Sequence, residues 1–207
     1  MKSIICALAL LAAALPASGS AQDGLLAKMS ALNKNLHSYT ATMKAHVVMT
    51  TFPFISTDLD GTYYHKDPDR DKLEITNGLP GVAQQFSKLY PHIVPPGQWD
   101  QVFTVDKISD DGSTTHFKLT PKKQGNVQTI DAVVDDKHGT VTSMTWNYAN
   151  GGTAQMTNTY SDIKGYELVT SQSGHVDEPQ YKGTITSTLT NYKINPNLPD
   201  SVFSEAQ

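Results

Sequence analysis

The sequence predicts a mainly β protein with helices, of class α+β, in which one curved antiparallel sheet wraps around the helices. Apolar and polar residues alternate with a period of two through most of the chain, which is typical of half-buried strands. Short turn signals separate these segments, and short connections favour antiparallel neighbours. Two segments with helical spacing interrupt the pattern. A curved sheet has a hollow side, and what fills the hollow decides the function.

The N-terminal segment, Met1–Ala21, has the pattern of a secretory signal peptide. Lys2 supplies a positive charge, Ile4–Leu15 is apolar, and small residues precede a cleavage point after Ala21. The apolar run is too short to span a bilayer. Cys6, the only cysteine, lies inside that run rather than at the cleavage point, so no lipid anchor is expected. We therefore expect an exported protein of the bacterial periplasm that does not span the membrane.

Residues 22–207 are expected to form a single domain, because single β domains commonly reach this length. The formal net charge of the whole chain is −4, and the charges are scattered without a basic patch. Nucleic acid is therefore not an expected partner. Since no cysteine follows the leader, disulfides, thiolate metal sites and a cysteine nucleophile are excluded.

The segment Asp23–His37 is predicted to be an amphipathic helix. Its apolar residues follow helical spacing and form one stripe, which should pack on the sheet. The stripe consists of Leu25, Met29, Leu32 and Leu36.

The first predicted strand, Tyr39–Thr51, has an unusual apolar face. The face is made of Tyr39, Ala41, Met43, Ala45, Val47 and Met49. Methionine adapts to varied shapes, whereas a tightly specified core more often uses branched residues. The face is therefore either the wall of a ligand cavity or a core that tolerates alanine and methionine.

A short helix is predicted inside the segment Gly78–Gly97. Pro91 ends it, and a stiff Pro95–Gly97 hinge follows. Its apolar residues at helical spacing are Val82, Phe86, Leu89 and Tyr90. The helix is either a lid or plug over the hollow side, or an ordinary helix that covers the core.

The rest of the chain is predicted to be strands joined by turns. Asn150–Gly152 is the strongest hairpin signal, because glycine accepts a positive φ without strain. The predicted strands after the first are Ile55–Lys66, Lys72–Thr76, Gln101–Ile108, Thr114–Leu119, Thr129–Val134, Val141–Tyr148, Thr153–Lys164, Tyr166–His175 and Tyr181–Tyr192.

The sequence carries no pattern of bond-making chemistry. The seven histidines lack the spacing of metal ligands. Asp67–Asp71 superficially resembles a calcium loop, but Lys72 and Gly78 replace the required glycine and glutamate. Paired acids stand at turns or strand ends, which does not indicate a glycosidase pair. We expect neither an enzyme nor a metal site nor a cofactor.

The segment Asp60–Thr76 resembles an element of the periplasmic lipoprotein carriers, the LolA family of lipoprotein-sorting proteins. Those carriers have a glycine, a strand, a proline turn and a second strand in this order. The matching residues are Gly61, Tyr63, Lys66, Pro68, Arg70, Leu73 and Glu74. Further elements agree in order along the chain, namely Leu119–Pro121, the Val134–Trp146 hairpin, Thr159–Lys164 and Pro199–Phe203.

The resemblance implies an incomplete half-barrel of antiparallel strands with a helical lid over an apolar cavity for acyl chains. It implies lipid or lipoprotein acyl chains as ligands, and inner-membrane donor and outer-membrane acceptor proteins as partners. One position departs from the family. The carriers have an arginine before the turn proline that helps hold the lid closed, whereas this chain has Asp67, with Arg70 nearby.

The expected function is that of a periplasmic carrier or binding protein for lipids or acylated lipoproteins. The alternative is an envelope regulatory or assembly module that binds a protein partner through a sheet edge or the lid groove. The residues expected to line the cavity wall are Met43, Val47, Met49, Met144, Trp146, Met156 and Tyr160. The residues expected to line the lid are Phe86, Leu89 and Tyr90.

Overall fold

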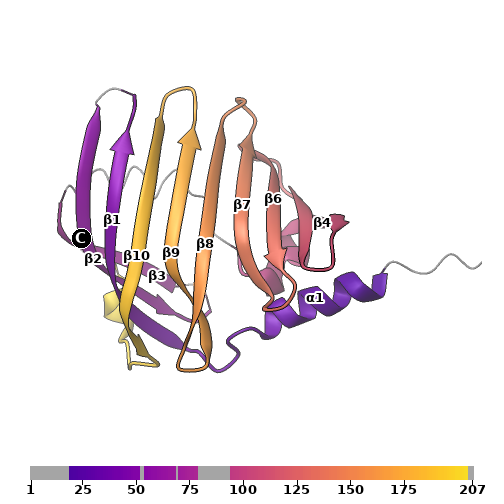
Figure 1. Cartoon of the computed structure of the whole chain (residues 1–207), viewed down its shortest axis with the longest axis horizontal. Coiled ribbons are helices and arrows are strands. Elements are labelled where there is room, and N and C mark those ends of the chain that lie inside the picture. The colour runs from indigo at the N-terminus through magenta and orange to yellow at the C-terminus, as the bar shows by residue number, and fades with distance from the viewer. Residues whose placement is uncertain (1–18, 52–53, 69, 79–93, 205–207) are drawn as a thin grey trace, which may run out of the picture.

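The computed structural model describes residues 19–51, 54–68, 70–78 and 94–204. Ten antiparallel strands form one sheet that stays open, in the order β3-β2-β1-β10-β9-β8-β7-β6-β5-β4 (Figure 1). The strands are β1 (Ser38–Met49), β2 (Ile55–Lys66), β3 (Arg70–Asn77), β4 (Phe103–Asp110), β5 (Thr114–Pro121), β6 (Val127–Asp135), β7 (Thr140–Tyr148), β8 (Thr153–Ile163), β9 (Tyr166–Asp177) and β10 (Lys182–Ile194).

Two meanders build the sheet. One runs from β1 to β3, the other from β4 to β10, and the pairing of β1 with β10 joins them. This junction extends from Tyr39 opposite Ile194 to Met49 opposite Gly183. The predicted class, a mainly β half-barrel with few helices, is confirmed.

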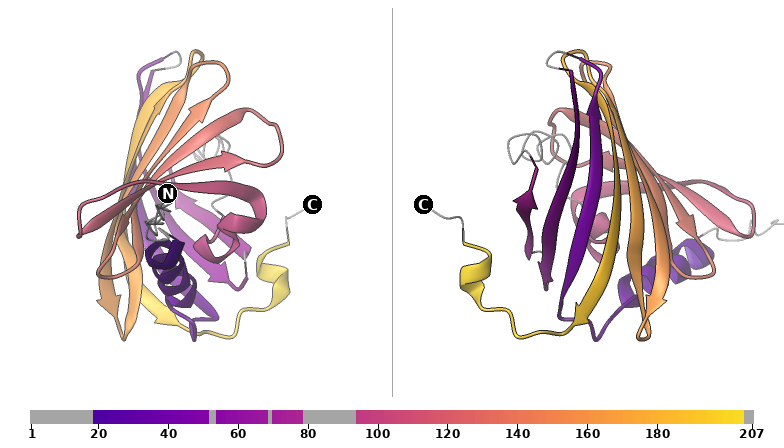
Figure 2. Two further views of the ribbon diagram at one scale, coloured as in Figure 1. Left: turned by 90° about the vertical axis from the view of Figure 1, so that its right-hand side faces the viewer. Right: turned by 60° about the vertical axis from the view of Figure 1, so that its left-hand side comes forward.

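The sheet curves around the helical segments, which lie on its concave side (Figure 2). Irregular pairing supports this curvature, because an extra residue bends a strand and increases its twist. One such shift separates Thr40 and Thr42 on β1, and Asn191 on the facing stretch of β10 has a φ of 54°. The helical segments are α1 (Gly19–Ala31), η1 (Pro96–Gln98), α3 (Trp99–Val102) and η2 (Asp200–Val202).

The N-terminal helix ends earlier than the sequence predicts, at Ala31 rather than His37. Asn33 has a φ of 58°, in the left-handed region that commonly follows a helix end. Its side-chain amide donates to the Glu167 carbonyl at 2.8 Å and accepts from the Glu167 N–H at 3.0 Å. These two bonds attach the end of α1 to β9, so the chain turns toward β1 there.

A second difference concerns the start of β4. The sequence predicts a strand from Gln101, but Trp99–Val102 forms a short helix and the strand begins at Phe103. Trp99 is buried in the core, and its indole N–H donates to the Val94 carbonyl at 3.0 Å. Burial of this indole stabilises the helical turn. The sequence predicts a strand there because the alternating pattern of β4 extends back over these residues. Of the helix predicted within Gly78–Gly97, residues 79–93 lie outside the described residues.

Buried apolar side chains gather in two clusters. The first lies mainly under β5–β8 and includes Met29 of α1 and Trp99 of α3. The second lies on one face of β1 and β2 and contains Met43, Ala45, Val47, Met49 and Leu59. Within the described part of the chain, no helix has the length and apolar character needed to cross a membrane.

Candidate ligand-binding cavity

A cavity of about 1050 Å³ lies on the concave face of the sheet. Strands β1–β3 and β7–β10 contribute side chains to it, as do α1, α3 and the segment that contains η1. Its apolar and aromatic lining includes Met29, Leu32, Tyr39, Met43, Leu59, Tyr63, Val94, Trp99, Val141, Met144, Met156, Tyr160, Val169, Ile185, Leu189 and Tyr192.

Strand alternation places these side chains in the cavity. On β8, Ala154, Met156 and Asn158 are buried while the residues between them are exposed. The same alternation on β10 directs Ile185 and Leu189 to the concave side. The cavity wall is therefore a direct consequence of the period-two pattern.

Gly61 illustrates a position at which the fold requires glycine. The pairing of β2 and β3 is irregular between Asp60 and Gly61, and β3 approaches closely there. A Cβ atom at Gly61 would lie 2.6 Å from the Glu74 carbonyl oxygen, which is shorter than any tolerable contact. This glycine lies opposite Met43, so it also keeps the cavity wall next to Met43 free of a further side chain.

The residues expected to form the cavity wall fall into two groups. Met43, Met144, Met156 and Tyr160 line the cavity. Val47 and Met49 are buried in the second apolar cluster, and Trp146 is 1% exposed in the first. The expected lid residues Phe86, Leu89 and Tyr90 lie outside the described residues.

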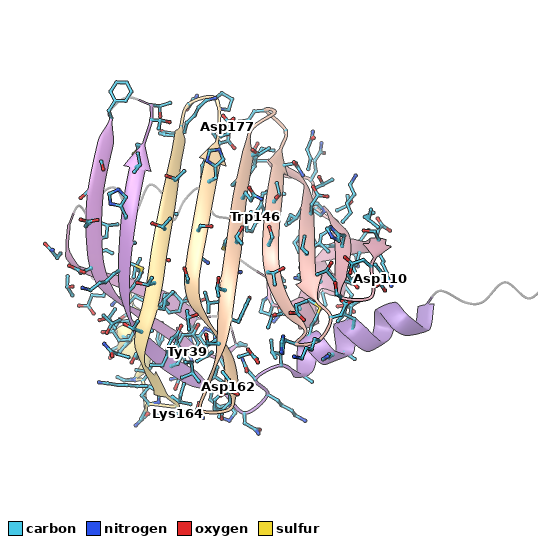
Figure 3. All side chains as sticks on the ribbon, viewed as in Figure 1. Tyr39, Asp110, Trp146, Asp162, Lys164 and Asp177 are labelled. Carbon is cyan, nitrogen blue, oxygen red and sulfur yellow. The ribbon has the colours of Figure 1, made fainter. Side chains whose placement is uncertain are left out.

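Figure 3 labels Tyr39 near the end of the sheet where β1 begins, whereas Trp146 lies nearer its centre. Tyr39 belongs to an aromatic group at this end of the cavity. The ring of Tyr39 stacks on His65 with a centroid distance of 5.0 Å. Its centroid lies 5.8 Å from that of Tyr63 and 5.6 Å from that of Tyr192. Tyr39, Tyr63 and Tyr192 thus line this part of the cavity with an apolar but hydroxyl-bearing surface.

The tyrosine phenols that line the cavity are protonated at neutral pH. Burial raises the pKa of Tyr39 and Tyr63 well above the ordinary value. Burial also raises the pKa of Tyr160 and Tyr192 to about 12. The cavity therefore presents neutral hydroxyl groups rather than phenolates.

Asp71 anchors the aromatic group from β3. Tyr63 donates to its Oδ1 at 2.6 Å, and His65 Nδ1 lies 2.8 Å from the same oxygen. Burial alone would lower the pKa of His65, but the hydrogen bond and charge of Asp71, together with Asp67, outweigh it. The pKa of His65 is therefore raised, and the fold favours the protonated imidazole.

The helical segments that line the cavity pack against β5 and against each other. Trp99 meets Phe117 edge-on at a centroid distance of 6.1 Å. A Cβ atom at Gly97 would lie 3.2 Å from Ser30 Oγ, so η1 passes close to α1. Pro95 and Pro96 line the cavity beside this contact.

Arg70 does not take the place of the family arginine at the cavity. Its Nη1 atom lies 2.7 Å from Asp200 Oδ1, and its guanidinium lies 5.5 Å from the centre of the Phe203 ring. Asp67, which stands at the arginine position of the carriers, lies 3.5 Å from His65. Arg70 thus attaches the C-terminal segment to β3.

Strands β8, β9 and β10 each contribute one polar side chain to the cavity lining, and we call these three residues the polar row: Asn158, Gln172 and Ser187. Sequence reasoning missed them, together with the inward orientation of Tyr63 and Tyr192. The signal that the sequence offers is a polar residue on the strand face that is otherwise apolar and that points into the cavity. Over the described ranges, no group of three potential metal-binding side chains occurs.

Solved structures of three bacterial proteins share this fold. A DUF1329 family protein from Desulfovibrio piger has a TM-score of 0.58 and 10% identity, with 89% of this chain and 96% of that chain covered. An outer membrane lipoprotein-sorting protein domain from Vibrio parahaemolyticus has a TM-score of 0.58 and 10% identity, with coverages of 88% and 95%. A LolA superfamily protein from Nitrosomonas europaea has a TM-score of 0.53 and 8% identity, with coverages of 88% and 97%.

The predicted resemblance to the LolA-like carriers is confirmed as a likeness of fold. Identities of 8–10% show the fold alone. No protein-family model matches the chain, and no curated protein sequence matches it. The function therefore has to be argued from the cavity.

Proposed function

We propose that this protein is a carrier or binding protein of the bacterial envelope that holds an acyl chain in the concave cavity. The observation that supports this proposal is the cavity of about 1050 Å³, lined mostly by methionine, aliphatic and aromatic side chains. Ligand sites are typically concave, mainly apolar and of this order of volume. Met43, Met144, Met156 and Tyr160 are the proposed wall, with Val47, Met49 and Trp146 behind it.

The energetics of such binding suit a reversible carrier. Each buried methylene contributes about 0.8 kcal/mol, so about ten methylenes contribute roughly 8 kcal/mol. That free energy corresponds to a dissociation constant of about 1 μM before the costs of association. Since those costs lower the affinity, one acyl chain would be bound reversibly, as a carrier that passes its ligand on requires.

The location and partners follow from the same proposal. Met1–Ala21 would direct the chain to the periplasm, where acyl chains need shielding between two membranes. A donor protein at the inner membrane and an acceptor at the outer membrane would load and unload the cavity. The proposed role is binding, and it requires no cofactor.

Mass spectrometry of the protein purified from the cells that produce it tests the proposal. The mass is measured under non-denaturing conditions and again after solvent extraction. We expect a stoichiometric lipid or acylated peptide that the extraction removes. A clean unliganded mass, together with no uptake of lipid offered in vitro, would contradict the carrier role.

The sheet edges support a second candidate, a module that binds a protein partner. Strands β3 and β4 form the two edges of the sheet, and each carries an exposed apolar residue, Leu73 or Ile108. An extended partner segment can add to such an edge through backbone hydrogen bonds. A stable complex with an envelope protein and an empty cavity would favour this role over the carrier.

A further inference from the structure

The polar row runs straight across the floor of the cavity. Asn158 on β8 is the direct partner of Gln172 on β9, and Gln172 is the direct partner of Ser187 on β10. Asn158 and Ser187 are 9% and 7% exposed, so both are buried within the fold. Three neighbouring strands thus place a polar side chain at the same level of an otherwise apolar wall.

Apolar side chains flank the row on both sides. Met156 and Ile185 lie on one side of it, one step further along β8 and β10. Tyr160 and Leu189 lie on the other side, on the same two strands. A ligand across this floor would therefore meet apolar wall, then the polar row, then apolar wall again.

The hydrogen bonds within the row have a defined direction. Asn158 Nδ2 donates to the Val141 carbonyl at 3.1 Å, so Asn158 Oδ1 faces the other way. That oxygen accepts from Gln172 Nε2 at 3.0 Å, and Gln172 Nε2 also lies 3.0 Å from Met156 Sδ. Since the amide nitrogen of Gln172 is committed to these contacts, its oxygen Oε1 is left as an acceptor.

Ser187 provides the complementary group. Among the described residues its hydroxyl has no hydrogen-bond partner, although the residue lines the cavity and is buried. A serine hydroxyl donates one hydrogen bond and also accepts. Side by side on β9 and β10, Gln172 Oε1 and the Ser187 hydroxyl offer one acceptor and one donor to a molecule in the cavity.

We propose that Gln172 and Ser187 recognise a neutral group that both donates and accepts hydrogen bonds, a secondary amide or a hydroxyl, carried on the acyl chain. This inference rests on the proposed carrier function and specifies its ligand. An apolar chain alone would leave both groups desolvated without partners, which is costly. The amide or hydroxyl satisfies them at the level where the wall is polar.

The charges around the cavity exclude an ionised group at this level. Of the described lining residues only Asp71 and Lys72 are charged. Both lie on β3, and β2 and β1 separate that strand from β10. An ionised group beside Gln172 would lose its hydration without gaining a counter-charge.

Competition with a fluorescent apolar naphthylamine probe tests the inference on the full chain. Three ligands with the same alkyl length are compared: N-methyldodecanamide, dodecanol and methyl dodecanoate. The ester accepts hydrogen bonds but cannot donate one. We expect the amide or the alcohol to displace the probe at a concentration roughly three- to tenfold lower than the ester.

Two variants test whether Gln172 and Ser187 of the polar row cause this difference in affinity. Gln172→Met should abolish the higher affinity of the amide and the alcohol relative to the ester. Ser187→Ala should lower the affinity for all three ligands roughly threefold relative to the probe. Ser173→Ala is the matched control, because Ser173 is exposed on the opposite face of β9 and should change nothing. Thermal melts confirm that each variant is folded.

The outcomes separate this inference from the carrier proposal. An advantage for the amide alone identifies an amide-linked chain, and an advantage for the alcohol alone identifies a hydroxylated chain. If the probe binds but the three ligands compete equally, the recognition by Gln172 and Ser187 is wrong while the carrier role stands. If the probe does not bind at all, both are overturned.

Discussion

The concave face of the sheet has a filled half and a hollow half. In the filled half, under β5–β7, Trp99 packs edge-on against Phe117, and Met29 and Trp146 belong to the same buried cluster. In the hollow half, along β1–β3 and β8–β10, the wall borders a cavity of about 1050 Å³, and Met29, Trp99 and Met144 line it at the boundary with the filled half. One sheet thus carries a close-packed core and a ligand-sized space next to each other.

The two halves have the same strand pattern but different side chains. The filled half contains two tryptophans and a phenylalanine, each about 1% exposed. The hollow half has alanine and methionine on β1, and glycine at Gly61 and Gly174, where neighbouring strands carry Met43 and Met156. Small and flexible side chains leave space, whereas large rigid rings fill it. The difference suggests that stability and binding can be changed separately.

The largest expected effect is a difference in stability between substitutions in the filled half and in the hollow half. Trp146→Ala should lower the free energy of unfolding by about 3–5 kcal/mol, because it empties a closed part of the core. Met43→Ala, in the cavity wall, should cost about 2 kcal/mol, because its side chain already borders a space. Urea denaturation measures both. Equal losses in the two variants would mean that the halves are equally packed.

The next largest expected effect concerns ligand affinity, which only a substitution inside the cavity should change. Ile185→Trp places a large ring inside the cavity and should weaken binding of an apolar probe at least tenfold, with an overpacking cost of roughly 1–3 kcal/mol. Thr186→Trp is the matched control, since the neighbouring residue is exposed on the other face. Fluorescence titration of the probe measures both variants. Unchanged affinity in Ile185→Trp would place the ligand elsewhere.

The smallest effect concerns the aromatic group in the hollow half. The pKa of His65 is raised in the fold, so its contribution to stability is full below about pH 6.5 and is lost as the pH rises through the folded value. The difference in unfolding free energy between the wild type and His65→Gln should therefore be larger at about pH 5.5 than at about pH 8. Urea denaturation at both pH values checks this sign.

His46→Gln is the control for the loss of a histidine–aspartate pair. His46 also pairs with an aspartate, Asp58, at 2.7 Å, but its side chain is 49% exposed. Exposed ion pairs contribute little to stability, so His46→Gln should change the free energy of unfolding less than His65→Gln does at about pH 5.5. A larger difference for His65→Gln at about pH 8 than at about pH 5.5 would contradict the assigned direction.

Local sequence signals located the strands well. The predicted strand Ile55–Lys66 has the observed bounds, and the other strands differ by a few residues at their ends. Gly151, at the predicted Asn150–Gly152 turn, has a φ of 81°, as a glycine in a tight hairpin permits. The early end of α1 was missed because Asn33 ends the helix by binding the distant Glu167, which is no local property.

The cavity residues were harder to predict. The polar row exists because β8, β9 and β10 pair in one particular register, with an extra residue of β9 between Val169 and Ser171. No single strand reveals that Asn158, Gln172 and Ser187 share one level. Likewise, the alternation on β7 that buries Trp146 also directs Met144 inward, and only the packing opposite each residue distinguishes core from cavity wall.

The sequence alone predicts the secondary structure and the antiparallel meander, because alternation and turn residues act over a few neighbouring positions. It also predicts which face of each strand is apolar. Which apolar face meets a helix and which borders the cavity is known only from the three-dimensional structure. That choice depends on the curvature of the sheet and on where Trp99 and Met29 enter, and both arise from contacts between residues far apart in the chain.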